Sequence, residues 1–154
     1  MDYRNYDNFL SLYFSCMEGF KKFESTPRDF GTGQKLHGSE IHTLQMIGKN
    51  EHCNLTQLAK RLGISKSGLS KFIKKLLEKD LIDKKKDDAN GKEVFFTLTT
   101  KGHIAFLAHE EFDKKMFSSI FSLLDSYSTG ELDLLESFLG NLSHLLRELN
   151  NDME

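Results

Sequence analysis

The sequence contains little cysteine, little proline and no long apolar run. Its two cysteines, Cys16 and Cys53, are too few for a disulfide framework. The single proline, Pro27, stands in a loop over 25–33 that is rich in glycine and polar residues. No stretch approaches the roughly 20 apolar residues that cross a bilayer. These features exclude a disulfide-stabilised scaffold, a proline-rich linker and a membrane-spanning chain.

Motifs of the common enzyme classes are also absent. No Gly-rich phosphate loop follows a predicted strand, and no Cys-x-x-Cys pair or Ser/His/Asp grouping stands out. The polar, acidic first residues do not resemble a signal peptide. At 154 residues the chain fits one domain. We therefore expect a cytoplasmic, reduced protein that is not an enzyme and holds no certain cofactor.

Residues 56–75 have the pattern of a helix-turn-helix. Ala59 is small where two helices cross closely, Gly63 tolerates the positive φ of the turn, and Leu69 is the apolar centre of the second helix. The remaining inward positions at helical spacing are Leu58, Leu62, Ile64, Phe72, Ile73 and Leu76. Two short helices at such an angle can place the second in a DNA major groove.

The predicted outer face of the second helix carries hydroxyls and cations. Ser65 is expected to cap the helix, and cations with hydroxyls suit phosphates and base edges. The predicted DNA-contacting residues of this helix are Ser65, Lys66, Ser67, Ser70, Lys71, Lys74 and Lys75. Gly68 is unusual inside a helix, where glycine costs about 1 kcal/mol relative to alanine. It predicts a close approach of DNA or of the preceding helix.

A basic hairpin is predicted next. Residues 81–86 and 93–98 read as strands, and Asn90-Gly91 between them favours a tight type I′ turn. The predicted DNA-contacting residues of this hairpin are Lys84, Lys85, Lys86, Asn90 and Lys92. A helix-turn-helix followed by such a hairpin is a winged helix.

The charge of the chain is segregated. The formal net charge is only −2, but residues 60–92 hold eleven Lys or Arg and five Asp or Glu. That segment therefore carries six surplus positive charges, and the remainder carries eight surplus negative ones. Concentration of one sign in the winged-helix segment indicates an electrostatic surface for nucleic acid.

Apolar helices are predicted on both sides of the winged helix. One spans 6–24, a second is expected to be capped by Ser39, and a third runs from about Thr99 to about Ser126 with Ile104 and Leu107 facing inward. A capping box at 128–131 opens the last. Exposed, these helices would form a larger apolar patch than a soluble monomer tolerates. We therefore expect a homodimer on a pseudo-palindromic duplex.

The chain resembles the MarR family of transcription regulators over nearly its whole length. The resemblance rests on the ordered segments LHGSEI (36–41), LTQLAKRLGISKSGLSK (55–71), LLEKDLI (76–82) and LTTKG (98–102). It implies a mainly α fold with a small β-hairpin wing, in which a winged helix-turn-helix core is flanked by N- and C-terminal dimerisation helices. Within one domain over 1–154, the DNA-binding lobe would span 36–102, and dimerisation would use 1–35 and 103–154.

The family also implies a repressor that an effector releases from operator DNA. The wing departs from the family pattern, because Asn90-Gly91-Lys92 replaces the usual Asp-x-Arg. A lysine point charge lacks the fork of a guanidinium, so we expect a wing that contacts the DNA backbone with less discrimination of sequence. A rival interpretation is a winged-helix module that binds protein without specific DNA binding.

The effector is less clearly indicated. His109 and Asp113, at i and i+4, can bind one metal, and with His42 and Glu24 they resemble the ligand segments of zinc-sensing family members. Zn²⁺ is therefore a candidate effector; alternatively, the two histidines only pack at the junction of lobe and dimer. Two further hypotheses are oxidation of Cys16, against an inert core thiol, and a lipophilic ligand in a crevice. The predicted lining of that crevice is Phe9, Tyr13, Phe30 and Met46.

Overall fold

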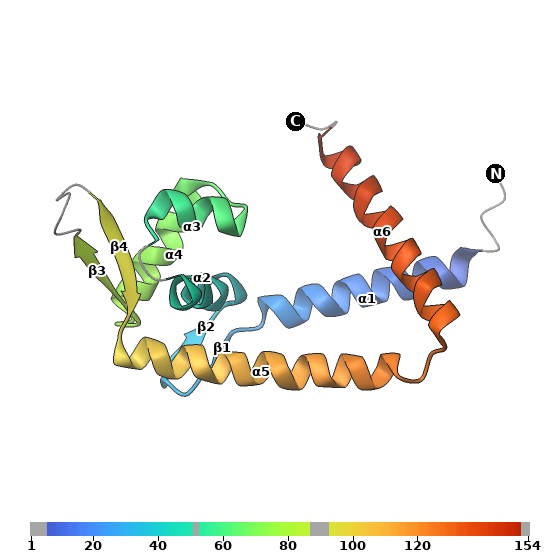
Figure 1. Ribbon diagram of the computed structural model, residues 1–154, viewed down its shortest axis with the longest axis horizontal. Coiled ribbons are helices and arrows are strands. Elements are labelled where there is room, and N and C mark those ends of the chain that lie inside the picture. Colours follow the sequence, from blue (N-terminus) through green and yellow to red (C-terminus); the bar gives the residue numbers. More distant parts are fainter. Residues whose placement is uncertain (1–5, 51–52, 87–92, 152–154) are drawn as a thin grey trace. The chain divides into compact units, whose positions relative to one another are not determined.

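A computed structural model describes residues 6–50, 53–86 and 93–151 (Figure 1). In chain order this part contains α1 (Asp7–Ser25), β1 (Arg28–Asp29), β2 (Lys35–Leu36), α2 (Gly38–Lys49), α3 (Leu55–Leu62), α4 (Lys66–Glu78), β3 (Ile82–Lys86), β4 (Val94–Leu98), α5 (Thr100–Leu124) and α6 (Thr129–Asn151). The chain forms two compact units, and the boundary falls inside α5 after Glu111.

The predicted helix-turn-helix is confirmed as α3 and α4. Asn54 caps α3, since its side chain accepts from the Gln57 N–H (3.0 Å) while Gln57 bonds back to the Asn54 N–H (3.0 Å). Gly63 ends α3 with φ 65°, which an L side chain rarely adopts. Ser65 caps α4 as predicted, because its hydroxyl accepts from the Gly68 N–H at 3.1 Å.

The prediction that Ser39 caps the next helix is wrong. α2 begins one residue earlier, at Gly38, and His37 is its N-cap. The His37 N–H has no backbone partner within the helix, and it donates to the carboxylate of Glu40, the third residue of α2, at 2.9 Å.

The core of the first unit lies between α2, α3, α4 and the wing. Leu44, Leu58, Leu69, Leu76 and Leu81 have no exposed surface. Each contributes about 1.5–3 kcal/mol by burial. Ile64, predicted to face inward, is instead 38% exposed. The buried leucines fix which face of α4 points to solvent.

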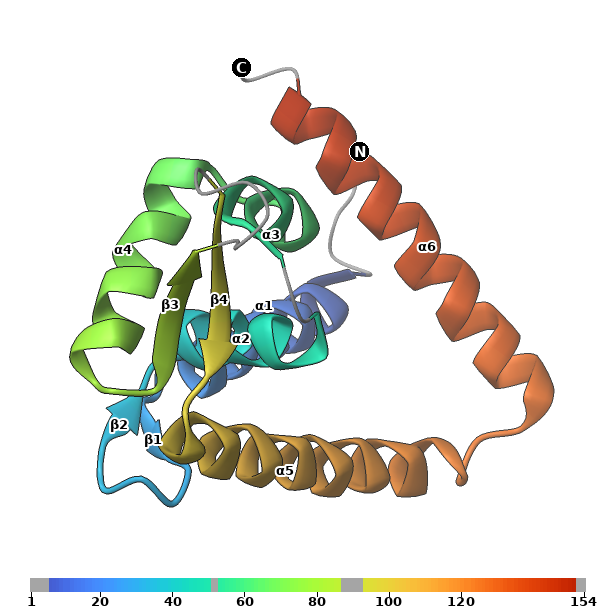
Figure 2. The same cartoon turned by 60° about the vertical axis from the view of Figure 1, so that its left-hand side comes forward.

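The wing is the antiparallel pair β3–β4, which lies beside α4 in both views (Figures 1 and 2). Its register runs from Ile82 opposite Leu98 to Lys86 opposite Val94. Each strand begins or ends within one residue of its predicted bounds. The predicted Asn90-Gly91 turn and Lys92 lie outside the described residues.

The first turn of α5 lies close to the backbone of Leu81, the residue before β3. Ala105 and His109 are buried, whereas Ile104 and Leu107, predicted to face inward, are 49% and 64% exposed. At Gly102 a Cβ would overlap the Leu81 carbonyl oxygen and lie 3.0 Å from its carbon. The buried side of α5 therefore consists of two small residues, Gly102 and Ala105, together with His109.

The helices flanking the lobe bury little of their own apolar surface. α1 and α6 contain no buried residue, and Phe14 and Leu134 are 64% and 71% exposed. At the start of α6 Glu131 accepts from the Ser128 N–H at 2.8 Å, which is one half of the predicted capping box. None of the described helices is long and apolar enough to cross a membrane.

Candidate nucleic-acid interface

The exposed face of α4 carries the predicted DNA-contacting residues. Leu69, Ile73 and Leu76 are buried against the core. The side chains that the sequence assigned to DNA are all exposed, namely Ser65, Lys66, Ser67, Ser70, Lys71, Lys74 and Lys75. The structure therefore brings these residues to one solvent-facing side of a helix; whether they touch DNA stays a prediction.

The hydroxyls of α4 are already engaged within the helix. Ser65 Oγ accepts the capping bond and lies 3.1 Å from Ser67 Oγ. Ser70 Oγ donates to the Lys66 carbonyl at 2.8 Å. A hydroxyl has one proton and two lone pairs, so Ser70 offers DNA chiefly an acceptor. The lysines are the principal donors of this face.

The structure narrows the interpretation of Gly68. An added Cβ would meet only Ser65 Oγ, at 3.2 Å, and no atom of α3. The expectation that Gly68 relieves a close contact with the preceding helix is therefore wrong. Its other predicted role, close approach of DNA, stays a prediction.

A hollow lies between α4 and the wing, and most of its lining is apolar, from Leu55, Ile73, Leu77 and Phe96. It has a volume of about 470 Å³, and its lining includes Ser70 and Lys74 from α4 and Lys84 from β3. Lys84, Lys85 and Lys86 are exposed, and strand alternation sends Lys84 toward α4. Lys74 also lies 3.7 Å from Glu78, an exposed pair of little energetic weight.

One lysine of the basic segment is not part of this surface. Lys79 Nζ lies 3.0 Å from a carboxylate oxygen of Glu40, whose side chain is 1% exposed. Burial opposes ionisation of Glu40, but the His37 N–H and the Lys79 ammonium outweigh it, so the pKa of Glu40 is below its ordinary value. Nothing near Lys79 in the sequence marks it as paired, because its partner Glu40 is 39 residues away.

The predicted metal ligands are brought together only in part. The His42 and His109 rings meet edge to face, with centroids 5.5 Å apart, and Phe30 contacts His109 at 5.2 Å. Glu24 lies beside Gly38, with a carboxylate oxygen 3.1 Å from where a Cβ would be. Asp113 follows the unit boundary in α5. Within the described ranges, no three His, Cys, Asp or Glu residues form a metal-binding group.

A second polar cluster ties α2 to α5. Glu110 Oε1 accepts from Gln45 Nε2 at 2.7 Å and pairs with Lys49 Nζ at 2.8 Å. The Lys49 and Gln45 bonds hold the pKa of Glu110 below its usual range. This cluster connects α2 of the DNA-binding lobe to the first half of α5.

The residues of the other two proposed sensors differ in burial. Cys16, expected to be an inert core thiol, is exposed in the single chain. Of the predicted crevice residues, Phe30 is buried against His109 while Phe9 is 48% exposed. Oxidation of Cys16 and a lipophilic ligand stay predictions.

A helix-turn-helix with a basic outer face, followed by a lysine-rich antiparallel wing, defines a winged-helix DNA-binding protein. The comparisons with known proteins agree. A model of the MarR family matches residues 36–94. The transcriptional regulator PchR of Bacillus subtilis is 32% identical over 114 residues, which cover 74% of this chain and 68% of PchR.

Solved structures match the fold over most of the chain. The zinc-responsive MarR family member ZitR of Lactococcus lactis has a TM-score of 0.74 at 23% identity, covering 90% of this chain and 97% of ZitR. The DNA complex of wild-type ZitR has a TM-score of 0.76 at 20% identity, covering 90% of this chain and 96% of that chain. This chain belongs to the MarR family, and it is a DNA-binding transcription regulator.

Proposed function

We propose that the chain is a cytoplasmic homodimer that represses transcription by occupying a pseudo-palindromic operator, and that an effector releases it. Residues 36–102 form the DNA-binding lobe, and residues 1–35 and 103–154 form the dimer. The observation that carries the proposal is the face of α4, where lysines are exposed opposite buried Leu69, Ile73 and Leu76. Cations on such a helix neutralise DNA phosphates and position it in the major groove.

The exposed apolar side chains support the dimer. The large ones that are at least 60% exposed are Tyr6, Leu12, Phe14, Leu107, Phe121, Leu123, Leu134 and Leu139. They lie mostly on α1, α6 and the second half of α5, outside the DNA-binding lobe. A second copy that buries this surface gives a two-fold particle with recognition helices about 34 Å apart, one turn of DNA.

The salt dependence of DNA binding tests the proposal. We expect the protein to select a duplex from a randomised library and to lose affinity steeply with salt as counterions are released. Lys71→Ala with Lys74→Ala should lower the slope of log K against log salt by about two. Lys21→Ala with Lys22→Ala on α1 removes equal charge from an exposed site and should leave the slope unchanged.

The result also separates DNA binding from the rival interpretation. A winged helix that binds only protein would select no duplex and show no salt-dependent DNA affinity. Loss of slope in both double variants alike would mean that the charge of the whole chain, and not the α4 face, attracts DNA.

We further propose Zn²⁺ as the effector, held by His42 and His109 with Glu24 and Asp113. The contact of the two rings supports this, because paired imidazoles suit zinc, as does the likeness to zinc-responsive ZitR. Zinc binding would cross-link α2 to α5 through their side chains. Glu24 and Asp113, which follows His109 by four residues, stay the carboxylates that the sequence predicts for this donor set.

Calorimetric titration of Zn²⁺ into chelator-treated protein tests this site. We expect a dissociation constant below about 1 µM, lost on His42→Ala with His109→Ala and retained on His144→Ala, an exposed histidine of α6. Binding weaker than this, or equal binding in all three proteins, would leave the two histidines with a packing role alone.

A further inference from the structure

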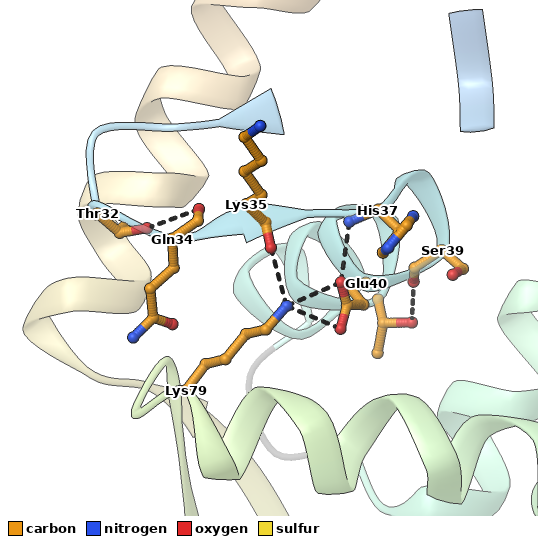
Figure 3. Close-up of polar contacts among 8 residues, drawn as sticks. Thr32, Gln34, Lys35, His37, Ser39, Glu40 and Lys79 are labelled. Carbon is orange, nitrogen blue, oxygen red and sulfur yellow. Dashed lines mark hydrogen bonds and ion pairs between the residues drawn. The ribbon is translucent and has the colours of Figure 1, made fainter. Parts of the chain in front are cut away.

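A partly buried ion pair holds the C-terminal end of α4, with Glu40 buried and the Lys79 side chain 25% exposed. Lys79 is the C-cap residue of that helix, and its Nζ lies 3.0 Å from both carboxylate oxygens of Glu40 in α2. The same Nζ donates to the Lys35 carbonyl of β2 at 3.0 Å, as Figure 3 shows. All three N–H bonds of the ammonium therefore have acceptors, and one side chain joins α4 to two other elements.

The surrounding contacts continue this attachment. The Glu40 carboxylate also accepts the His37 N–H, which fixes its orientation at the start of α2. Lys101 Nζ reaches the Lys79 carbonyl at 3.4 Å, and Thr99 Oγ1 donates to the Asp80 carbonyl at 2.8 Å. The end of α4 is thus bonded to α2, β2 and the segment that leads into α5.

The Glu40–Lys79 pair restricts the orientation of α4 more narrowly than apolar packing does. Leu69, Ile73 and Leu76 hold α4 on the core, but hydrophobic attraction is non-directional and tolerates small rotations and slides. Charge-assisted hydrogen bonds have fixed geometry, whereas the desolvation of Glu40 and the partial desolvation of Lys79 offset much of their net contribution to stability. The principal consequence of this pair is geometric.

We propose that Glu40 and Lys79 are positioning residues for DNA recognition, which set the rotation and axial position of α4 so that its exposed face meets one register of base edges. Recognition sites need their groups within about 0.5 Å and 10–20° of the productive geometry. Lys79 is then an internal anchor and no phosphate contact. This inference rests on the proposed DNA-binding face of α4.

The test replaces the pair by Glu40→Met with Lys79→Met, which keeps net charge and approximate volume and leaves no unpaired charge. Two affinities are measured by fluorescence anisotropy: for the duplex selected by the wild-type protein, and for a scrambled duplex of equal length. We expect the ratio of the two to fall at least tenfold, with an unchanged salt slope. Amide hydrogen exchange in the second half of α4 should accelerate in the free protein.

Lys74→Met is the matched control on the same helix. As a proposed phosphate contact it should weaken binding to both duplexes alike and lower the salt slope by about one. The inference is overturned if the double variant keeps the wild-type affinity ratio and the wild-type rate of amide hydrogen exchange in α4. It is also overturned if the double variant weakens binding to both duplexes alike and lowers the salt slope, as Lys74→Met should.

The inference can still be tested if the double variant does not fold or if the wild-type protein selects no duplex. If the double variant does not fold, Glu40→Gln, which retains the shape and the acceptor for His37, takes its place with the same expected fall in ratio. If the wild-type protein selects no duplex, the proposed DNA-binding face fails, and hydrogen exchange alone then judges whether the pair fixes α4: unchanged exchange overturns it.

Discussion

Replacing Gly102 by alanine is a test in which helix propensity predicts a more stable protein and the tertiary structure predicts a less stable one. In an open helix, Gly→Ala stabilises by about 0.5–1 kcal/mol. At Gly102 in the first turn of α5, the new Cβ would overlap the Leu81 carbonyl oxygen. We therefore expect Gly102→Ala to destabilise the protein.

The size of the effect follows from what must move. Backbone cannot yield as a flexible side chain does, and overpacking of this kind costs about 1–3 kcal/mol. Separating α5 from Leu81 also strains the Thr99 N–H bond to that carbonyl, 3.1 Å long, which adds about 1 kcal/mol. A loss of about 3 kcal/mol lowers Tm by roughly 6–12 °C for a chain of this size.

Urea unfolding followed by circular dichroism, at one fixed protein concentration, measures this change. Gly130→Ala is the matched control, because Gly130 also lies in the first turn of a helix and an added Cβ there meets nothing within 4 Å. We expect the control to be neutral or slightly stabilising. If Gly102→Ala is as stable as Gly130→Ala, the close approach of α5 to Leu81 is not a feature of the folded protein.

Three further predictions concern the lobe and the dimer. The pKa of Glu40 is lowered in the folded state, so its contribution to stability is present above the unfolded value of 4.5 and is lost as pH falls through the lower folded value. Because the Lys79 side chain is 25% exposed, Glu40→Gln should cost about 1–3 kcal/mol near neutral pH and little in acid; a constant cost across the pH range of urea titrations would contradict this. Ser65→Ala removes the cap of α4 and should cost about 1 kcal/mol in the same assay, whereas no loss would show that the 3.1 Å bond to the Gly68 N–H is immaterial. Leu139→Glu places a charge on an apolar side chain 60% exposed in the single chain; sedimentation should show single chains and anisotropy weaker DNA binding, while an intact dimer would exclude Leu139 from the interface.

Local patterns were sufficient for much of the fold. Gly63 and Ser65 predicted the turn and the cap of the helix-turn-helix, because a positive φ and an N-terminal acceptor are requirements of neighbouring backbone. The apolar spacing of Leu69, Ile73 and Leu76 predicted which face of α4 is buried, and therefore that its lysines are exposed.

Contacts between distant segments were not predictable in the same way. Glu40 and Lys79 are 39 residues apart, and nothing near either residue marks it as paired. Ile104 and Leu107 read as core by hydropathy, yet both are exposed in the single chain, where Gly102, Ala105 and His109 form the buried side of α5. Cys16 was assigned to the core for the same reason and is exposed in the single chain.

The sequence by itself determined the helix-turn-helix, the basic wing and the solvent-facing lysines, since each depends on residues a few positions apart. The tertiary structure alone decided which lysine is withdrawn from the basic surface, which of the predicted ligands meet, and how closely α5 approaches Leu81. Each of these features involves groups that are far apart in the sequence and come within bonding distance only when the core is packed.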